Sequence, residues 1–480
     1  MKRGVKEKSI IRTHSAELIA AFALLCALGI FAYWGFSRTS LSLKGAVAAA
    51  VCFLMYAAGF ALAIPPAIRF FKGESTAPAL VVGERSGKAK NRHPVVYVML
   101  FTLLSRIILV IIAYIISNIA WGYTGSIFSR MESIWYKLDT DAANYIYIAE
   151  NWYTQEIPGA YNIVFLPLFP LLIRGLNLVF NNSFVSAMLL NTALSCAASA
   201  VIYELALRDM GRRAAKTAVV FAFAMPAAFF YTAPMSEALF LLLSASALLA
   251  MRKGRFILAG VFCALSCLTR SVGIILFVPF VFEAVAQAVG QFRTKGRQEH
   301  AAFVAKAAFG GIVFLLGVLA YLVLNKLVFG DWFKFIDYQR DVWYQRPGFF
   351  MSTVAHHTDR FFETLGVDNS AALGLWLFNL IFMFGALAAF MASARMLRTS
   401  YSAFFAVYFG LVCGASSLVS APRLLTALIV IPIALAQLCN LRDDGMDIVR
   451  ARVKTAIVTA LLLAGQVFYL VLFILKYEVY

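Results

Sequence analysis

PVVYVMLFTLLSRIILVIIAYIISNIAW, residues 94–121, is a long apolar run that contains one charged residue, Arg106. About 20 apolar residues in a helix are enough to cross the hydrocarbon core of a bilayer. Twelve other segments have the same character, which makes roughly thirteen in all, and we expect 11 to 13 transmembrane helices. The thirteen are 16–36, 44–68, 94–121, 183–207, 215–233, 235–251, 255–270, 272–290, 304–329, 371–393, 401–419, 422–440 and 455–477. The sequence therefore predicts an all-α polytopic membrane protein.

The composition excludes a soluble protein. Hydrophobic residues make up 62% of the 480 residues and charged residues only 14%, too few to cover the surface of a water-soluble domain. The net charge of +18 would suggest nucleic acid in a soluble chain. Here the basic residues fall in clusters between apolar segments, all on one side of the membrane under the thirteen-helix count. The positive-inside rule makes that side the cytoplasm, with the N-terminus inside and the C-terminus outside.

The chain divides into three predicted regions. Residues 1–93 form a two-helix extension with a polar linker, residues 94–440 form the membrane core, and residues 441–480 hold a cytoplasmic loop and a last helix. Two outer loops of the core, about 122–182 and 330–370, are long enough to be functional. The first contains two amphipathic patterns, 141–153 and 165–180, which predict helices that lie in the membrane interface.

Candidate chemistry gathers in the outer segments. Asp139 and Asp141 precede or open the helix predicted over 141–153, where an acid caps free amides. A carboxylate there is equally suited to take a proton from an attacking hydroxyl as general base. Glu237, at the start of an outer helix, also has both a capping and a functional interpretation.

If the reaction transfers a sugar from a lipid phosphate, the departing lipid phosphate is an anion. Cations, preferably Arg, are then needed nearby to stabilise that anion. The outer candidates are Arg174, Arg270, Arg340, Arg346, Arg360, Arg423, His356 and His357, and for each the alternative is anchoring at the interface. Arg106 lies at mid-span and requires a partner or a function, with Glu204 and Glu283 as candidate partners. The sequence predicts no metal site, because the five His are scattered and Cys263 and Cys267 lie four apart on an apolar helix. The scattered Cys residues also predict no disulfide framework.

The stretch DAANYIYIAENWY followed by FLPLFPLLIR resembles the PIG-V family, of the GPI mannosyltransferase 2 type. Asp141 matches the acid of the family's first motif, Tyr145 its aromatic residue and Arg174 the end of its second motif. Further matches follow in the family's order: Ser105-Arg106, MSEALF with Glu237, LTRSVG with Arg270, and APRLL with Arg423. Thr140 stands where the family has Trp, Trp152 where it has Gly, and Leu424 where it often has Tyr. These departures leave the acceptor and the sugar open.

The resemblance implies a membrane glycosyltransferase of the GT-C type that inverts the anomeric carbon of a polyprenyl- or dolichyl-phosphate sugar, usually mannose. It implies a catalytic role for Asp141, and substrate binding by Tyr145, Arg174, Glu237, Arg270, Arg423 and Arg106. Asp139, two residues before the catalytic acid, is a further candidate for substrate binding. It implies no nucleotide sugar, no metal and no cofactor. The acceptor would be a glycan or glycolipid on the extracytoplasmic face of a cell membrane, or of the endoplasmic reticulum membrane in a eukaryote. One alternative is a multi-pass lipid or sugar transporter. The sequence shows no repeat between its two halves, and the candidate polar residues gather at one face of the membrane, which both argue against a transporter. The other alternative is a membrane scaffold without catalysis.

Overall fold

A computed structural model describes residues 29–35, 42–72, 94–122, 125–137, 140–294, 296–416, 418–440 and 448–479. Every regular element among these residues is a helix. The helices of the first part of the chain, which ends with the first long outer loop, are α2 (Leu43–Phe71), α3 (Pro94–Trp121), α4 (Ile127–Lys137), α5 (Asp141–Asn151), η1 (Gly159–Val164) and α6 (Leu168–Phe180). Next come α7 (Ser183–Asp209), α8 (Arg212–Ala224), η2 (Pro226–Tyr231), α9 (Glu237–Arg252), α10 (Phe256–Cys267), η3 (Ser271–Leu276), α11 (Phe277–Thr294) and α12 (Arg297–Phe329). The remainder are α13 (Lys334–Asp341), α14 (Phe350–Thr364), η4 (Ala371–Trp376), α15 (Leu377–Ser393), α16 (Thr399–Val412), α17 (Ala421–Thr426), α18 (Val430–Asn440) and α19 (Ile448–Ile474).

The all-α, multi-pass architecture is confirmed, but the count of about 13 spans is not. Among the described residues, seven helical segments are long and apolar enough to cross a membrane: 43–71, 94–121, 183–209, 271–294, 297–329, 371–393 and 448–474. The other predicted spans correspond to shorter helices or are divided by turns, as at Pro226 between α8 and α9. Most residues of α9 are buried by protein, and hydropathy does not distinguish that environment from lipid. The first predicted span, 16–36, lies mostly outside the described residues.

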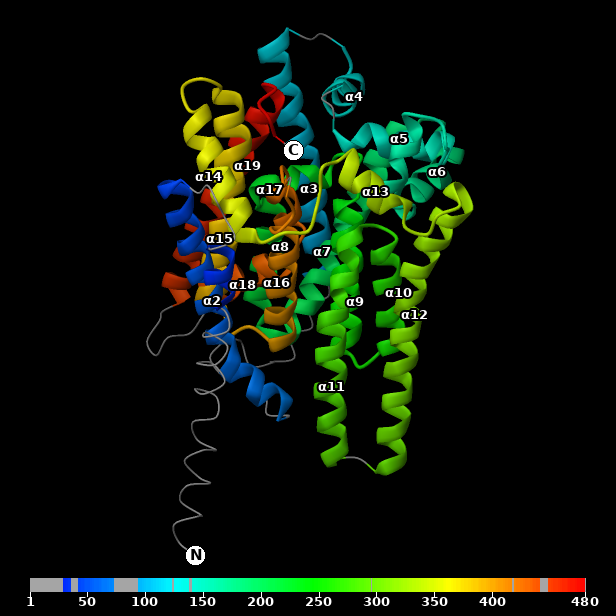
Figure 1. Cartoon of the computed structure of the whole chain (residues 1–480), viewed down its shortest axis with the longest axis vertical. Coiled ribbons are helices and arrows are strands. Elements are labelled where there is room, and N and C mark those ends of the chain that lie inside the picture. The colour runs from blue at the N-terminus through cyan, green and yellow to red at the C-terminus, as the bar shows by residue number, and fades with distance from the viewer. Residues whose placement is uncertain are drawn as a thin grey trace, which may run out of the picture.

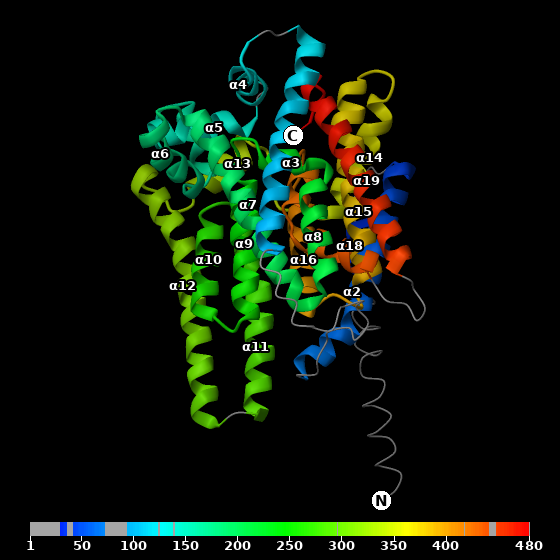
Figure 2. The ribbon, with the colours of Figure 1, turned by 180° about the vertical axis from the view of Figure 1, so that it is seen from behind.

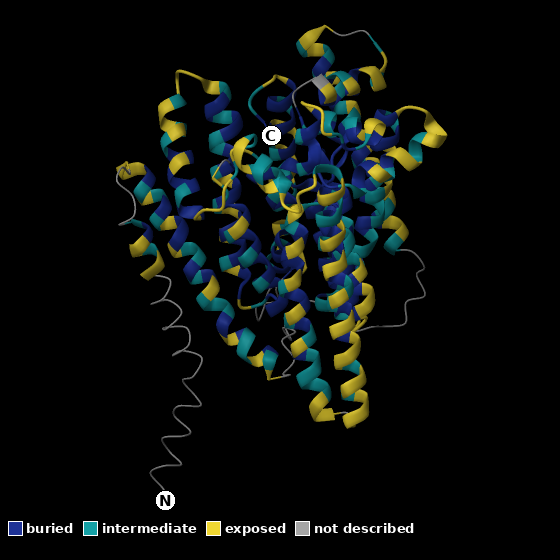
Figure 3. Ribbon diagram, turned by 45° about the vertical axis from the view of Figure 1, so that its right-hand side comes forward, coloured by how far each residue is buried: buried dark blue, intermediate teal, exposed yellow. Residues whose placement is uncertain are grey.

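The long helices carry apolar side chains on their outer faces. On α3 the exposed residues include Leu104, Ile108 and Ile115, and on α12 they include Phe309 and Leu316. Figure 3 shows these exposed surfaces along the α11–α12 pair. Such continuous apolar exposure fits contact with lipid tails.

Helices α10 and α12 pack with their backbones in close approach. A Cβ atom at Gly310 would collide with the carbonyl of Phe256, and one at Gly317 would collide with the carbonyl of Ala264. Small residues let transmembrane helices approach closely, so that backbone and side-chain packing supply the association energy. These glycines therefore fix the position of α10, which leads directly to Arg270.

We expect Gly310→Ala to destabilise the protein, because the added methyl group requires α10 and α12 to separate. The expected cost is about 1–3 kcal/mol, as for other overpacked cores. Gly311→Ala is the matched control, since the nearest atom to its Cβ would be a ring carbon of Phe280 at 3.8 Å. Thermal unfolding in detergent should show a lower midpoint for Gly310→Ala alone, and equal midpoints for the two variants would contradict the packing account.

The two ends of the molecule differ in character. Helices α5, α6, α13 and α14 gather at the end opposite the tip of the α11–α12 pair (Figures 1 and 2). Helices are present at both positions predicted for the first outer loop, as α5 and α6, although α6 begins only after the 3-10 turn η1 and Pro167.

A separate ionic cluster joins α7, α9, α11 and α16. Arg398 binds Glu283 at 2.5 and 2.8 Å, and the Ser400 hydroxyl donates to the same carboxylate at 2.6 Å. Asp209 pairs with Arg252 and accepts a hydrogen bond from the Tyr401 hydroxyl at 2.8 Å. The lining of the cavity described below includes none of these residues, so the cluster connects the helices elsewhere in the fold.

Candidate active site

Four charged residues from four separate elements form one connected group. Asp141 is the first residue of α5, Glu237 the first of α9, Arg270 the residue before η3, and Arg423 lies in α17. The Arg423 guanidinium lies 2.5 Å from Asp141 Oδ2 through Nη2 and 3.0 Å from Glu237 Oε1 through Nε. Arg270 Nη1 lies 2.5 Å from the same Glu237 oxygen. Two carboxylates and two guanidinium groups therefore balance one another in charge.

The Asp141 side chain is free of the capping duty that its position suggested. Thr140 is the N-cap of α5, and its hydroxyl accepts from the amide of Ala142 at 3.4 Å. The carboxylate of Asp141 instead faces Arg423 and is 27% exposed, the most accessible of the four charged side chains. Among the described residues, Arg423 contacts only one of the two Asp141 carboxylate oxygens. The other oxygen is available to a ligand.

Glu237 is the buried centre of the group. Its side chain is 2% exposed, and its Oε2 atom is buried without a hydrogen-bond partner among the described residues. Ser236, the N-cap, makes no capping bond and instead contacts the Tyr145 hydroxyl at 2.8 Å and Arg270 Nη1 at 3.3 Å. Burial raises the pKa of Tyr145 to about 12, so its hydroxyl stays protonated at neutral pH. Glu237 thus orients both arginines.

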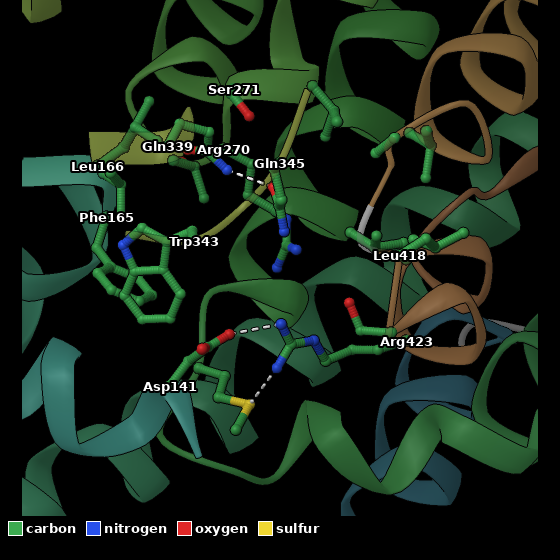
Figure 4. A pocket seen from close by; sticks show the side chains of 18 of the residues that line it. Asp141, Phe165, Leu166, Arg270, Ser271, Gln339, Trp343, Gln345, Leu418 and Arg423 are labelled. Atoms are coloured by element: carbon green, nitrogen blue, oxygen red, sulfur yellow. Dashed lines mark hydrogen bonds and ion pairs between the residues drawn. The ribbon is translucent and has the colours of Figure 1, made fainter. Parts of the chain in front are cut away.

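A half-open cavity of about 520 Å³ lies in front of this group. Asp141, Tyr145, Arg270 and Arg423 line it, and Figure 4 shows both guanidinium groups reaching into its centre. The rest of the wall is largely apolar, with Val164, Phe165, Leu166, Phe230, Val272, Ile274, Ile275, Leu411, Val412, Leu418, Val419 and Leu424. An apolar cavity with a few convergent polar groups is typical of a small-molecule site.

Two other predicted site residues lie away from the cavity, and a third is not among the described residues. Arg174 is exposed on α6 and does not line the cavity, so the structure does not bring it together with the other charged residues. The buried residues of its helix are Phe169, Pro170 and Ile173. Arg106 donates to the carbonyls of Ala228 at 2.5 Å and Phe223 at 2.8 Å. It therefore secures the end of α8, and its partners are backbone carbonyls rather than Glu204 or Glu283. Asp139 lies outside the described residues.

The remaining outer cations are also absent from the cavity wall. Arg340 pairs with Asp337 and Asp341, and Arg360 pairs with Glu363, all at the surface. Arg346 is exposed, and His356 and His357 belong to α14. Burial, with a smaller contribution from His356, lowers the pKa of His357 to about 3. His357 is therefore neutral at pH 7 and is unsuited to receive an anion.

The buried His357 predicts acid sensitivity. Its pKa is about 3 in the folded protein and about 6.5 in the unfolded chain, so only the unfolded chain gains this proton between those values. Stability is full above pH 6.5 and falls by roughly 2 kcal/mol between pH 7 and pH 5. Thermal midpoints at these two pH values should differ less for His357→Gln than for the unaltered protein. An identical difference for both proteins would contradict the assignment.

Several wall residues escaped the sequence analysis. Gln339, Trp343 and Gln345 line the cavity from α13 and the segment that follows it. They belong to the outer loop predicted over 330–370, whose length was the only signal. Neither charge nor helical periodicity distinguishes them from the rest of that loop.

Comparison with known proteins adds a family relation. A model of the dolichyl-phosphate-mannose-protein mannosyltransferase family matches residues 166–316. This region includes Glu237 and Arg270 but not Asp141 or Arg423. The match agrees with the prediction of a glycosyltransferase enzyme, because the matched family is one of mannosyltransferases. The finer resemblance to the PIG-V family stays a prediction, and no curated protein matches the chain.

Among solved structures, the chain is similar to the oligosaccharyltransferase of Archaeoglobus fulgidus. The apo form has 12% identity and a TM-score of 0.37 over 82% of this chain and 57% of that one. The form tethered to an acceptor peptide has 14% identity and a TM-score of 0.35 over 79% and 55%. The archaeal oligosaccharyltransferase AglB with an inhibitory peptide and a dolichol-phosphate has 13% identity and a TM-score of 0.36 over 78% and 56%. The chain thus spans less than 60% of these proteins, and similarity at this level does not establish a shared fold.

Proposed function

We propose that this chain is a GT-C-type membrane glycosyltransferase that moves mannose from a polyprenyl-phosphate or dolichyl-phosphate donor to a glycan or glycolipid acceptor. The observation that carries the proposal is the cavity in which one accessible carboxylate, Asp141, lies beside two arginines, Arg270 and Arg423. The mannosyltransferase family match over residues 166–316 supports the donor class. The PIG-V-like order of the motifs supports the same donor.

The two arginines suit the phosphate of such a donor. Guanidinium groups bind phosphate through paired, charge-assisted hydrogen bonds, which are stronger in an apolar surrounding than in water. The apolar wall around them, with Ile274, Ile275 and Leu424 among its residues, is compatible with the first part of a lipid chain. Charge and apolar surface together fit a lipid phosphate better than a free sugar nucleotide.

Asp141 is the general base of the proposed reaction. It takes the proton of an acceptor hydroxyl while that oxygen attacks the anomeric carbon from the face opposite the phosphate. The bond between the anomeric carbon and the phosphate oxygen breaks, and its electron pair leaves with the lipid phosphate. Arg270 and Arg423 stabilise that anion. The products are an inverted glycoside, the lipid phosphate and a protonated Asp141.

The proposed base is paired with one of the two arginines. Arg423 contacts Asp141 directly and occupies one of its carboxylate oxygens. A donor phosphate competes for the same guanidinium, while Glu237 holds Arg423 in position from the other side. Donor binding therefore releases Asp141 for the acceptor hydroxyl.

The proposed site faces the extracytoplasmic or lumenal side of a cell or endoplasmic reticulum membrane. The positive-inside distribution of Lys and Arg supports this side, since the outer loop segments carry α5 and α13 beside the cavity. A lipid-phosphate sugar is membrane-bound, so a half-open cavity near the interface suits it.

The test uses purified protein, radiolabelled polyprenyl-phosphate mannose and a membrane lipid extract. Label that moves into a new product supports the enzyme. Label that stays on the donor while the donor changes leaflet in proteoliposomes supports the transporter instead.

A further inference from the structure

The segment of residues 342–349, here called the strap, connects α13 to α14 (Figure 1), and its residues Trp343 and Gln345 line the cavity. It is fixed at its start, where the amide of Gln345 donates to the carbonyl of Gln339 at 2.9 Å. On the far side it is tied to Ser416, whose hydroxyl accepts from the amide of Arg346 at 2.9 Å. The amide of Ser416 donates in turn to the carbonyl of Arg346 at 3.0 Å. The strap is therefore a defined wall of the cavity.

Trp343 is the aromatic residue of this wall. Its indole packs edge-on against Phe165, with ring centroids 5.4 Å apart and an interplanar angle of 85°. Its Nε1 atom is buried and has no hydrogen-bond partner among the described residues. Packing rather than a hydrogen bond sets the orientation of the ring. Figure 4 shows the indole on the same side of the cavity as Asp141, facing the space in front of the guanidinium groups.

Two amides accompany the indole. Gln339 and Gln345 line the cavity beside Trp343 and bind each other through their side chains. One interaction between two amides leaves further donors and acceptors on both of them. The wall thus combines an aromatic surface with groups able to bind hydroxyls.

A hexose ring presents C–H groups on its faces and hydroxyl groups around its edge. An aromatic ring covers the first, and amides bind the second, as in other small-molecule sites. The arginines that bind phosphate in the proposed function lie across the cavity from Trp343, so the sugar has to lie between them and the strap. We propose that Trp343, with Gln339 and Gln345, binds the transferred sugar and is a specificity-determining residue. This inference rests on the proposed function.

The test compares two lipids of equal chain length, polyprenyl-phosphate mannose and bare polyprenyl phosphate, on the full-length protein in nanodiscs. Trp343→Ala should bind the mannosyl lipid about tenfold more weakly and the bare lipid within about twofold of the unaltered protein. Trp343→Phe should keep part of the lost affinity, because an aromatic ring remains. Trp332→Ala, an exposed Trp in the same outer loop, is the matched control and should change neither affinity.

The outcomes separate the two proposals. Equal losses for both lipids, or no loss for either, would overturn the assignment of Trp343 while the lipid-phosphate site stands. If the unaltered protein binds neither lipid, both the proposed function and this inference are wrong.

Discussion

Asp141→Asn should reduce the initial rate of mannosyl transfer by about 10²–10⁴-fold, the range that a positioned general base contributes. The asparagine preserves the shape of the side chain but takes up no proton. Because the substitution also releases Arg423 from its pair, the variant should bind bare polyprenyl phosphate at least as tightly as the unaltered protein. Rates from labelled donor and affinities from lipid titration measure the two effects.

A matched control for this variant lies on the same helix. Glu150 is an exposed acid near the end of α5, away from the cavity, so Glu150→Gln should leave both quantities unchanged. An unchanged rate in Asp141→Asn would remove this residue from the mechanism. A lost affinity for bare phosphate would mean that Asp141 supports the site structurally.

Arg270→Gln should weaken the binding of bare polyprenyl phosphate by about 10–100-fold, as expected for loss of a charge-assisted hydrogen bond. Transfer should fall further, by about 10²–10³-fold, because the departing phosphate carries more charge than the bound donor. Lipid titration and initial rates measure these changes. Arg174→Gln is the control, since Arg174 is also an outer arginine but is exposed on α6.

A second variant separates binding from folding. Arg270 pairs with the buried Glu237, and breaking such a pair can cost about 3–5 kcal/mol. Arg270→Lys keeps a cation for Glu237 but loses the planar fork. It should restore the thermal midpoint more fully than the phosphate affinity. If Arg174→Gln lowers activity as much as Arg270→Gln, the cavity is not the donor site.

The charged part of the site could be predicted because each residue lies at a helix end or within a short motif. Asp141, Glu237 and Arg270 were expected on one side of the membrane, and the fold brings them together with Arg423. The sequence could not say that Thr140 takes over the cap of α5 and leaves Asp141 free to face Arg423. That outcome depends on a single hydroxyl and on the packing of α5.

Other features could not be read from the sequence for physical reasons. Hydropathy does not distinguish a helix that crosses lipid from one such as α9, which is apolar on all sides because protein surrounds it. Arg174 lies away from the cavity, and a motif match could not show this because it gives only a position along the chain. Trp343 was missed because only the tertiary ties of the strap bring an irregular loop to the cavity wall.

The most direct test of the central claim is a cryo-EM structure of the full-length protein with polyprenyl phosphate in a lipid nanodisc. The predicted result is a phosphate group within hydrogen-bonding distance of both Arg270 and Arg423, with the contact between Arg423 and Asp141 opened. A phosphate bound away from both guanidinium groups, with the pair of Asp141 and Arg423 still closed, would contradict it.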